Sequence, residues 1–278
     1  MGILNVTPDS FSDGNRYYDR DKAIKHGLDL VKEGADILDV GGESSRPGSD
    51  PIPVEEELRR ILPVISELRK NSDIILSVDT TKAEVARMAL DAGADIINDI
   101  SSLQFDAEML PLAAEREVPV ILMHMKGYPK TMQENPFYEN LLEDVNSFFQ
   151  ERIDKAVSSG IKREKIILDP GIGFGKKYSD NLNLIRNLRT FEDLGRPLLV
   201  GLSRKSFIGK IVDQPTEDRL EGSLSAAVLS VSHGAHLVRV HDVAATKKAI
   251  LVADAILNEK EWNNTSISET GKSQRYVF

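Results

Sequence analysis

Eight short apolar runs, separated by longer segments with helical periodicity, constrain the fold of this chain most strongly. The runs are mostly continuous rather than alternating, which is typical of parallel strands covered on both faces. We expect strands at residues 1–6, 37–40, 74–78, 96–97, 118–123, 166–168, 198–202 and 237–240. Eight strand–helix units in 278 residues predict an α/β fold, a single (β/α)8 barrel. We place the barrel at residues 1–258 and expect the polar tail, residues 259–278, to be poorly ordered.

Three local patterns predict how the intervening helices begin and end. Apolar side chains recur with helical spacing in residues 54–68, and Pro63 is expected to kink or shorten that helix. The run Thr81-Lys-Ala-Glu84 is typical of a capping box at the start of the next helix. A glycine that follows a helical segment and precedes a strand supplies a left-handed cap, and we expect this of Gly34, Gly93 and Gly234.

Each apolar run ends at or just before a polar residue. These residues are Asn5, Asp39, Asp79, Asn98, His124, Asp169, Ser203 and His241. Catalytic groups of (β/α)8 enzymes come from the carboxyl ends of the strands, so the pattern predicts an active site there. Some of these residues are alternatively helix N-caps, but eight in succession make caps alone a poor account.

Composition excludes several function classes. A net charge of −9 argues against general nucleic-acid binding, which needs a basic face. The chain has no cysteine, which excludes disulfides, thiol nucleophiles and cysteine metal sites and suits a cytoplasmic enzyme. We expect no membrane span and no signal peptide, since no apolar run approaches ~20 residues. Because the chain opens inside an apolar run, we expect an upstream segment to be missing.

Two loops after the first strands have the composition of ligand-binding loops. Residues 5–14 form a turn-rich loop that could close over a substrate. In residues 39–48, Gly41 and Gly42 let the backbone approach a ligand, and Arg46 suits contact with an anion. An ordinary surface loop is the alternative for each.

The later strand ends predict a polar pocket for a flat anionic ligand. The run 169–176 lacks the spacing of a nucleotide-binding loop, so we interpret Asp169 as the functional group and its glycines as room for a flat ligand. Arg239 and His241 lie two apart on a strand, face the same side, and suit phosphate. A structural salt bridge, for example with Asp242, is the alternative. His124 either lines the pocket or is a core histidine.

Taken together, these stretches resemble the dihydropteroate synthases of the pterin-binding barrel family. The matching pieces are MGILNVTPDSFSDG, DVGGESSRPG, SVDT, NDI, MHM, DPGIGFGK, GLSRKSFIG and RVHDV, and they extend from residue 1 to about residue 243. The set in this order is highly specific. One departure is Ser45, where the family usually has Thr, and the family's short segment before the first strand is absent.

The resemblance implies that 6-hydroxymethyl-7,8-dihydropterin diphosphate and p-aminobenzoate are joined to give 7,8-dihydropteroate and diphosphate, in a dissociative step of folate biosynthesis. It implies a pterin site formed by Asp79, Asn98, Met123, Asp169 and Lys205. It implies a diphosphate site formed by Asn5, Ser45, Arg239 and His241, with Mg²⁺ bound by Asn5. It implies a p-aminobenzoate site formed by Phe11, Ser45, Arg46, Pro47, Ser203 and Lys205. Asp79, Lys205, Arg46 and Asp13 are the implied catalytic residues.

The resemblance also implies sulfonamides as inhibitors and a homodimer as the assembly. Two other functions remain open at this point. A methyltetrahydrofolate:corrinoid methyltransferase would share the Asp and Asn contacts, but it would not need the Arg-x-His anion site. A non-catalytic paralogue would bind pterin without turnover, although Asp79, Lys205, Arg239 and His241 weigh against it.

Overall fold

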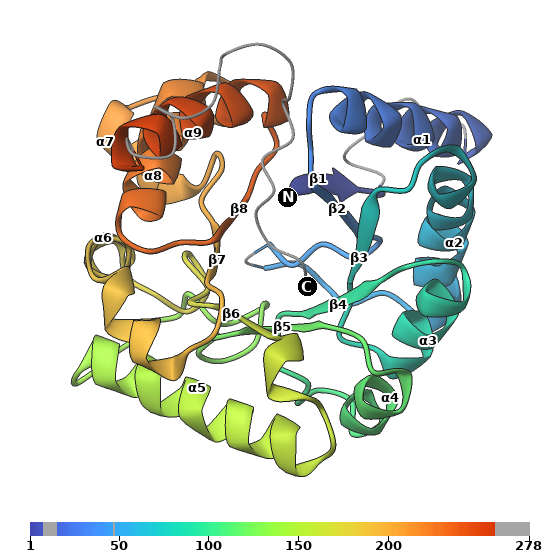
Figure 1. Ribbon diagram of the computed structural model, residues 1–278, viewed down its shortest axis with the longest axis horizontal. Coiled ribbons are helices and arrows are strands. Elements are labelled where there is room, and N and C mark those ends of the chain that lie inside the picture. The colour runs from blue at the N-terminus through green and yellow to red at the C-terminus, as the bar shows by residue number, and fades with distance from the viewer. Residues whose placement is uncertain (8–15, 47, 259–278) are drawn as a thin grey trace.

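The computed structural model describes residues 1–7, 16–46 and 48–258. Within those residues strands and helices alternate around a closed ring (Figure 1). The strands are β1 (Gly2–Asn5), β2 (Ile37–Gly41), β3 (Ile75–Asp79), β4 (Ile96–Asp99), β5 (Val120–Met123), β6 (Ile166–Asp169), β7 (Leu199–Gly201) and β8 (Leu237–Arg239). Each lies within or next to an apolar run that predicted it, so the barrel prediction is confirmed. The polar tail lies outside the described residues.

Helices surround the strands on the outside. They are α1 (Arg16–Lys32), α2 (Val54–Asn71), α3 (Ala83–Asp91), α4 (Met109–Arg116), α5 (Leu141–Ser158), α6 (Tyr178–Arg186), α7 (Ser206–Val212), α8 (Leu220–Ser232) and α9 (Val243–Leu257). Short 3₁₀ turns are η2 (Arg163–Lys165), η3 (Leu188–Leu194) and η4 (Thr216–Asp218). None of the helices described, from α1 to α9, is long and apolar enough to cross a membrane.

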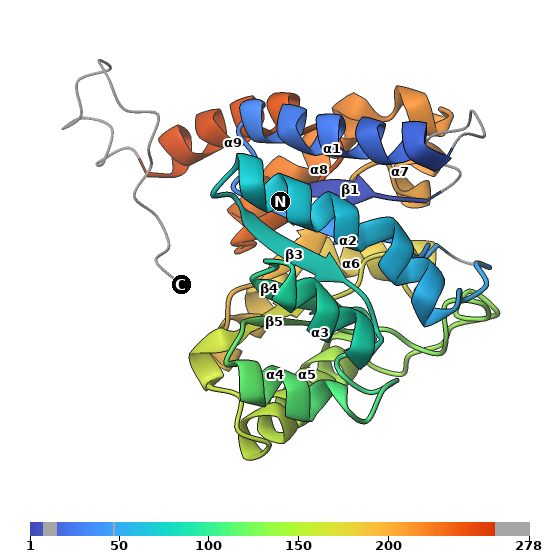
Figure 2. The same cartoon turned by 90° about the vertical axis from the view of Figure 1, so that its right-hand side faces the viewer.

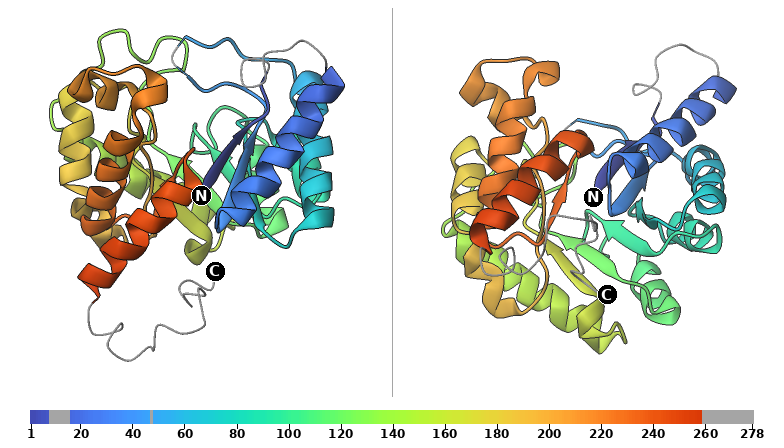
Figure 3. Two further views of the ribbon diagram at one scale, coloured as in Figure 1. Left: turned by 90° about the horizontal axis from the view of Figure 1, so that it is seen from above. Right: turned by 45° about the horizontal axis from the view of Figure 1, so that its top comes forward.

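All strand pairings are parallel. Strands β1 to β6 form one continuous sheet in chain order, and β7 pairs with β8. Single bridges join Leu168 to Leu198 and Gly2 to Val240, and these two bridges close the ring. In the left panel of Figure 3 the loops that follow the strands gather at the upper end of the barrel. The polar strand ends therefore face one common mouth.

Side chains two positions apart on a strand point to the same side. Along the barrel axis, apolar side chains therefore fill the interior, and mostly polar ones lie beyond them at the mouth. The interior cluster consists of Met1, Ile37, Ile96, Ile121, Ile167, Leu199 and Leu237. Two residues further along their strands, Asn98, Met123, Asp169 and Arg239 point to the same side at the mouth. The interior therefore forms an apolar floor beneath these side chains. Asp39 and Ser77 interrupt this floor, and both are fully buried.

One local prediction is wrong in part and another is wrong, for identifiable reasons. Helix α2 continues past Pro63 to Asn71, so the predicted shortening is wrong, while the predicted kink stays a prediction. Helix α3 has no capping box, because its N-cap is Lys82 and that side chain makes no capping hydrogen bond. Instead the backbone N–H of Ala83 donates to Asp106 Oδ2 at 2.8 Å, from the loop after β4. A side chain 23 residues away thus replaces the local cap.

The glycine caps are confirmed, since Gly34, Gly93 and Gly234 all have φ near +100° (95°, 109° and 103°).

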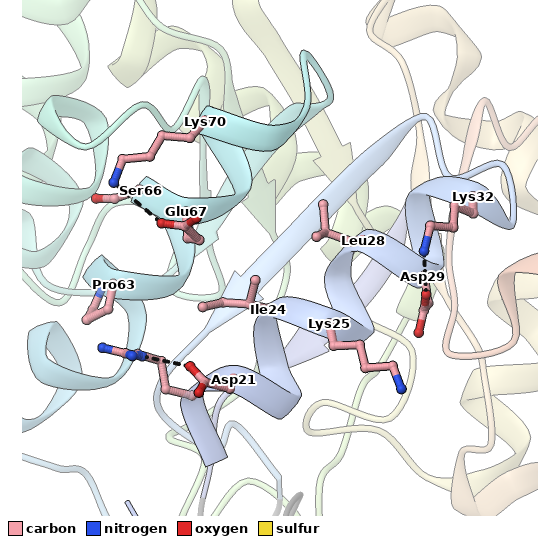
Figure 4. Close-up of a pocket in the computed structure, with 11 residues that line it drawn as sticks. Asp21, Ile24, Lys25, Leu28, Asp29, Lys32, Pro63, Ser66, Glu67 and Lys70 are labelled. Carbon is pink, nitrogen blue, oxygen red and sulfur yellow. Dashed lines mark hydrogen bonds and ion pairs between the residues drawn. The ribbon is translucent and has the colours of Figure 1, made fainter. Parts of the chain in front are cut away.

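Pro63 itself lines a surface groove between α1 and α2 (Figure 4). Three ion pairs within this groove join Arg20 to Asp21, Lys32 to Asp29 and Lys70 to Glu67. The groove lies on the outside of the barrel, away from the strand ends, so it is not the predicted site.

Candidate active site

Arg239 is the centre of a charged network at the mouth. Its Nε donates to Asp39 Oδ2 at 2.5 Å, and its Nη2 donates to Asp79 Oδ2 at 2.8 Å. Asn98 Nδ2 donates to the same Asp39 oxygen at 3.0 Å. The network joins the middle of β2 to the carboxyl ends of β3, β4 and β8. It brings together Asp79, Asn98 and Arg239, which the sequence analysis assigned to two adjoining sites.

The network differs from the alternative considered for Arg239. Asp242 pairs with Arg204, through bonds of 2.9 and 2.6 Å, and not with Arg239. Asp39 is the partner that sequence reasoning missed, although it stood among the polar strand ends. Its Oδ1 is buried and has no hydrogen-bond partner among the described residues. Nothing in the sequence relates Asp39 to Arg239, because 200 positions separate them.

Lys205 and Asp169 occupy the opposite side of the mouth. Lys205 is the N-cap of α7, and its Nζ donates to the Ile172 carbonyl and lies 4.8 Å from the centroid of the Phe174 ring. Asp169 ends β6, and its Oδ1 accepts from the Gly171 N–H at 2.7 Å. Met123 pairs with Asp169 in register, so its side chain lies beside this carboxylate at the end of β5. These three predicted pterin residues therefore surround one space.

The glycines after β6 serve a different purpose from the one predicted. Gly171 and Gly175 have left-handed φ values of 64° and 61°. A Cβ on Gly171 would overlap the His124 carbonyl oxygen, and one on Gly175 would overlap that of Lys126. These two glycines therefore make room for the backbone after β5 rather than for a ligand. A Cβ on Gly173 would meet Lys205 instead, at 3.4 Å from its Cδ.

Ser203 and His241 form a second polar pair, beside Arg239. The Ser203 hydroxyl lies 3.0 Å from His241 Nδ1 and accepts from the His241 backbone N–H at 3.2 Å. Burial lowers the pKa of His241 to about 4, together with the positive charges of Arg239, Arg204 and Arg46. His241 is therefore neutral at neutral pH, and it can offer an anion one N–H but no charge.

His124 is a core histidine and not a pocket residue. It is 5% exposed and packs edge-on against Phe148, with ring centroids 4.9 Å apart. Lys176 Nζ lies 2.9 Å from His124 Nδ1, and it also donates to the carbonyls of His124 and Phe174. Burial lowers the pKa of Lys176 to about 7, although Asp169 raises it. This buried lysine joins the segments after β5 and β6.

The remaining predicted residues are near the mouth or outside the described part of the chain. Asn5 ends β1 beside Gly41 of β2. Ser45 and the exposed Arg46 lie in the loop between β2 and α2. Phe11, Asp13 and Pro47 lie outside the described residues. Within residues 1–7, 16–46 and 48–258, no cluster of three His, Cys, Asp or Glu side chains could hold a metal.

Burial perturbs the charged groups of the mouth. It raises the pKa of Asp79 to about 7, although Arg239 opposes this change. It also raises the pKa of Asp169, against the effect of Lys205. It lowers the pKa of Lys205 to about 8, against the effect of Asp169. The pKa of Arg239 is raised, because Asp39 and Asp79 outweigh the effect of burial. Perturbed groups that converge in one place are typical of an active site.

Known proteins resemble this chain over nearly its whole length. The model of the family described as "Pterin binding enzyme" matches residues 1–241. The dihydropteroate synthase of Escherichia coli (strain K12) is 49% identical over 261 residues, which cover 94% of this chain and 92% of that protein.

Two solved structures show the same fold. The Xanthomonas albilineans dihydropteroate synthase with 4-aminobenzoic acid is 47% identical, with a TM-score of 0.88, and the match covers 93% of this chain and 92% of that one. The Yersinia pestis enzyme with a sulfonamide drug complex is 46% identical, also with a TM-score of 0.88, and the match covers 92% and 93%. The family match extends from β1 to His241, so it includes every strand end that contributes to the mouth. This chain belongs to the family of pterin-binding enzymes.

Proposed function

We infer that this chain is a dihydropteroate synthase, a transferase of folate biosynthesis. It joins 6-hydroxymethyl-7,8-dihydropterin diphosphate to p-aminobenzoate and releases diphosphate. The observation that carries this inference is the convergence of Asp79, Asn98, Asp169 and Lys205 beside the Arg239–His241 pair. A pterin edge alternates donors and acceptors, and a diphosphate is an anion, so this mouth offers complementary groups to both. The 49% identity to the E. coli enzyme over almost the full chain supports the same activity.

In this proposal each polar side chain faces a defined part of the pterin. Asp169 accepts from the 2-amino and ring N–H groups, and Asn98 both donates and accepts. Lys205 donates to the ring oxygen and nitrogen. Asp79 accepts a ring N–H and stabilises the positive charge that develops on the pterin. Met123 packs against the ring.

The diphosphate lies on the other side of Arg239. A guanidinium has five N–H donors, and the ion pairs with Asp39 and Asp79 use two of them, so others remain for phosphate oxygens. His241 adds a neutral donor, and Ser45 adds a hydroxyl. The carboxamide oxygen of Asn5 is a hard donor that fits Mg²⁺, which typically takes few protein ligands and completes its shell with phosphates and water. When bound, Mg²⁺ neutralises charge on the leaving diphosphate.

The proposed substitution is dissociative. The bond between the pterin methylene carbon and the diphosphate oxygen breaks first, and its electron pair leaves with diphosphate. The resulting cation is delocalised into the pterin, beside the Asp79 carboxylate. The amine lone pair of p-aminobenzoate then forms the new C–N bond, and a proton passes from nitrogen to solvent. The residues proposed to surround p-aminobenzoate are Phe11, Asp13, Ser45, Arg46, Pro47, Ser203 and Lys205. Of these, Asp13 and Arg46 are proposed to act in catalysis. No activated nucleophile is needed, because the acceptor is already a cation.

The proposal includes a homodimer. Helices α8 and α9 expose large apolar side chains, namely Leu229, Leu251, Val252, Ile256 and Leu257. An exposed apolar patch of this kind is typical of an interaction surface. Sedimentation at micromolar concentration tests this assembly, and a monomer there would contradict it.

A cytoplasmic location stays a prediction from the resemblance. Sulfonamides are proposed as competitors of p-aminobenzoate.

The experiment that tests the function is diphosphate release by the purified protein with dihydropterin diphosphate and Mg²⁺, with and without p-aminobenzoate. We expect release that depends on p-aminobenzoate, together with stoichiometric dihydropteroate. Omission of the diphosphate from the pterin should abolish turnover. A corrinoid methyltransferase would not require that diphosphate. Tight pterin binding without product would instead indicate a non-catalytic paralogue.

The dependence of kcat/KM on pH is expected to be bell-shaped for the dihydropterin diphosphate. The free-enzyme pKa values are about 7 for Asp79 and about 8 for Lys205, and kcat/KM reports the free enzyme. Below about 7 a protonated Asp79 stabilises the cation less well, and above about 8 a neutral Lys205 loses its charge. The maximum should lie between these values. A profile that is flat from pH 6 to pH 9 would contradict the assigned roles.

A further inference from the structure

The loop between β2 and α2, residues 42–53 (loop 2), is held at its base by a partly buried charge cluster. Lys82 Nζ lies 2.6 Å from Glu43 Oε2 and 2.5 Å from Glu57 Oε2. Glu43 belongs to loop 2, Glu57 to the first turn of α2, and Lys82 caps α3. Glu57 is 1% exposed, and its Oε1 is buried with no hydrogen-bond partner in the part of the chain described. We define these three residues as the Glu43–Lys82–Glu57 cluster.

The cluster joins both ends of loop 2. The Glu43 oxygen that contacts Lys82 also accepts from the Ile52 backbone N–H at 2.8 Å. Arg60 Nη1 donates to the Gly42 carbonyl at 2.8 Å, and Glu56 orients the same guanidinium. The loop therefore begins and ends at fixed points on α2 and α3. The segment between residues 43 and 52, which carries Ser45 and Arg46, projects from them.

Hydrogen bonds also hold the described part of the projecting segment, residues 44–46 and 48–51. The Ser49 hydroxyl donates to the carbonyls of Ser44, at 2.6 Å, and Arg46, at 2.8 Å. The Gly48 N–H donates to the Pro129 carbonyl at 3.1 Å, so the segment rests on the loop after β5. Figures 2 and 3 show the loops after β2 and β5 meeting at the mouth. Arg46 therefore lies between two points of attachment, the base of loop 2 and the contact of Gly48 with Pro129.

Stability alone is a poor reason for this cluster. Two carboxylates share one ammonium, and one buried carboxylate oxygen remains unpaired. Apolar side chains of similar volume would often stabilise a fold at least as well as such an arrangement. Because one member lies on a loop and two lie at helix starts, the attraction acts mainly on the position of the loop.

We propose that the Glu43–Lys82–Glu57 cluster positions loop 2 so that Ser45 and Arg46 form one wall of the p-aminobenzoate site. The three residues are positioning residues, because they act through loop 2 and not on the substrate. This proposal rests on the p-aminobenzoate role of loop 2 given above. It assigns to the cluster an effect on p-aminobenzoate and, through Ser45, on the diphosphate. The pterin ring should be unaffected, since its proposed contacts come from other segments.

The test compares Glu43→Ala and Glu43→Gln with the control Glu55→Ala. Glu55 is an exposed carboxylate on the turn of α2 that also carries Glu57. Glu43→Ala removes the bonds to both Lys82 and Ile52, so we expect KM for p-aminobenzoate to rise by about tenfold or more. Glu43→Gln keeps an acceptor and loses the charge, so its effect should be smaller. Affinity for the pterin without its diphosphate, measured by calorimetry, should stay within about twofold of that of the parent enzyme. Hydrogen exchange of residues 44–53 should be faster in Glu43→Ala and unchanged in Glu55→Ala.

Four outcomes decide the proposal. Faster exchange in loop 2, with a raised KM for p-aminobenzoate and an unchanged affinity for the diphosphate-free pterin, would support it. Unchanged exchange would overturn the positioning role itself. An equal loss of affinity for p-aminobenzoate and for the diphosphate-free pterin would also overturn it, since the cluster would then be a general structural element. Faster exchange with an unchanged KM would also overturn it. Arg46→Ala then locates that failure, because an unchanged KM in this variant as well would show that loop 2 does not contact p-aminobenzoate. If Glu43→Ala does not fold, Glu43→Gln alone carries the comparison.

Discussion

Asp39→Ala is expected to lose most activity and a measurable part of its stability. Asp39 is fully buried and orients both Arg239 and Asn98. Its removal leaves the Arg239 charge with only Asp79, and breaking a buried ion pair typically costs about 3–5 kcal/mol. If that loss falls on transition-state binding, kcat/KM decreases on the order of 10²–10³-fold. The melting temperature should fall by roughly 5–15 °C, since each kcal/mol shifts it by a few degrees.

A matched control lies on the neighbouring strand. Ser77 pairs with Asp39 in register and is equally buried, but its hydroxyl has no hydrogen-bond partner in the described structure. Ser77→Ala should therefore leave kcat/KM close to that of the parent enzyme. Asp39→Asn retains the shape and loses the charge, so it separates packing from electrostatics. Unchanged kcat/KM in Asp39→Ala would show that Arg239 and Asn98 are positioned without Asp39.

Lys205→Ala is expected to produce the second large effect, on chemistry more than on folding. Lys205 is the cation that faces Asp169, and it is proposed to contact both pterin and p-aminobenzoate. A lost hydrogen bond from a charged donor, together with the lost electrostatic attraction between Lys205 and Asp169, should weaken binding by about 3–4 kcal/mol. This predicts a decrease in kcat/KM of roughly 10²–10³-fold, with weaker pterin binding in calorimetry.

The control for this change is Lys210→Ala, an exposed lysine on α7, the helix that Lys205 caps. It should retain nearly full activity. Lys205→Ala should also retain a cooperative thermal transition, because the Nζ bond to the Ile172 carbonyl is a single contact to a loop. Near-normal turnover would contradict the role of Lys205 in both substrate sites.

The strands and the mouth could be predicted because they depend on local sequence. Continuous apolar runs predict buried parallel strands, and the polar residue after each run lies at the same end of the barrel. Asp79, Asn98 and Asp169 were found in this way. Arg239 was found from its spacing to His241 on the last strand, and the role of Lys205 came from the family resemblance. Their common location follows from topology and needs no knowledge of individual contacts.

The partners of these residues could not be predicted, because they depend on contacts between distant segments. The bond between Arg239 and Asp39 joins β8 to β2, and the one between Lys82 and Glu43 joins α3 to loop 2. The predicted capping box of α3 failed for the same reason, because the cap comes from Asp106 in the loop after β4. Pro63 did not end α2, since packing of an amphipathic helix outweighs one lost backbone bond.

The two single bridges that close the ring have a thermodynamic consequence. The β7–β8 pair and the residues that follow each of its strands supply Ser203, Lys205, Arg239 and His241. The six-stranded sheet supplies Asn5, Asp79, Asn98 and Asp169. A ligand held by both groups links the two sheets across their weakest junctions. Its binding and the closure of the barrel are then coupled equilibria, so a ligand at 100 times its Kd adds about 2.7 kcal/mol to the stability of the closed ring. Folding and substrate recognition share one free-energy balance in this protein.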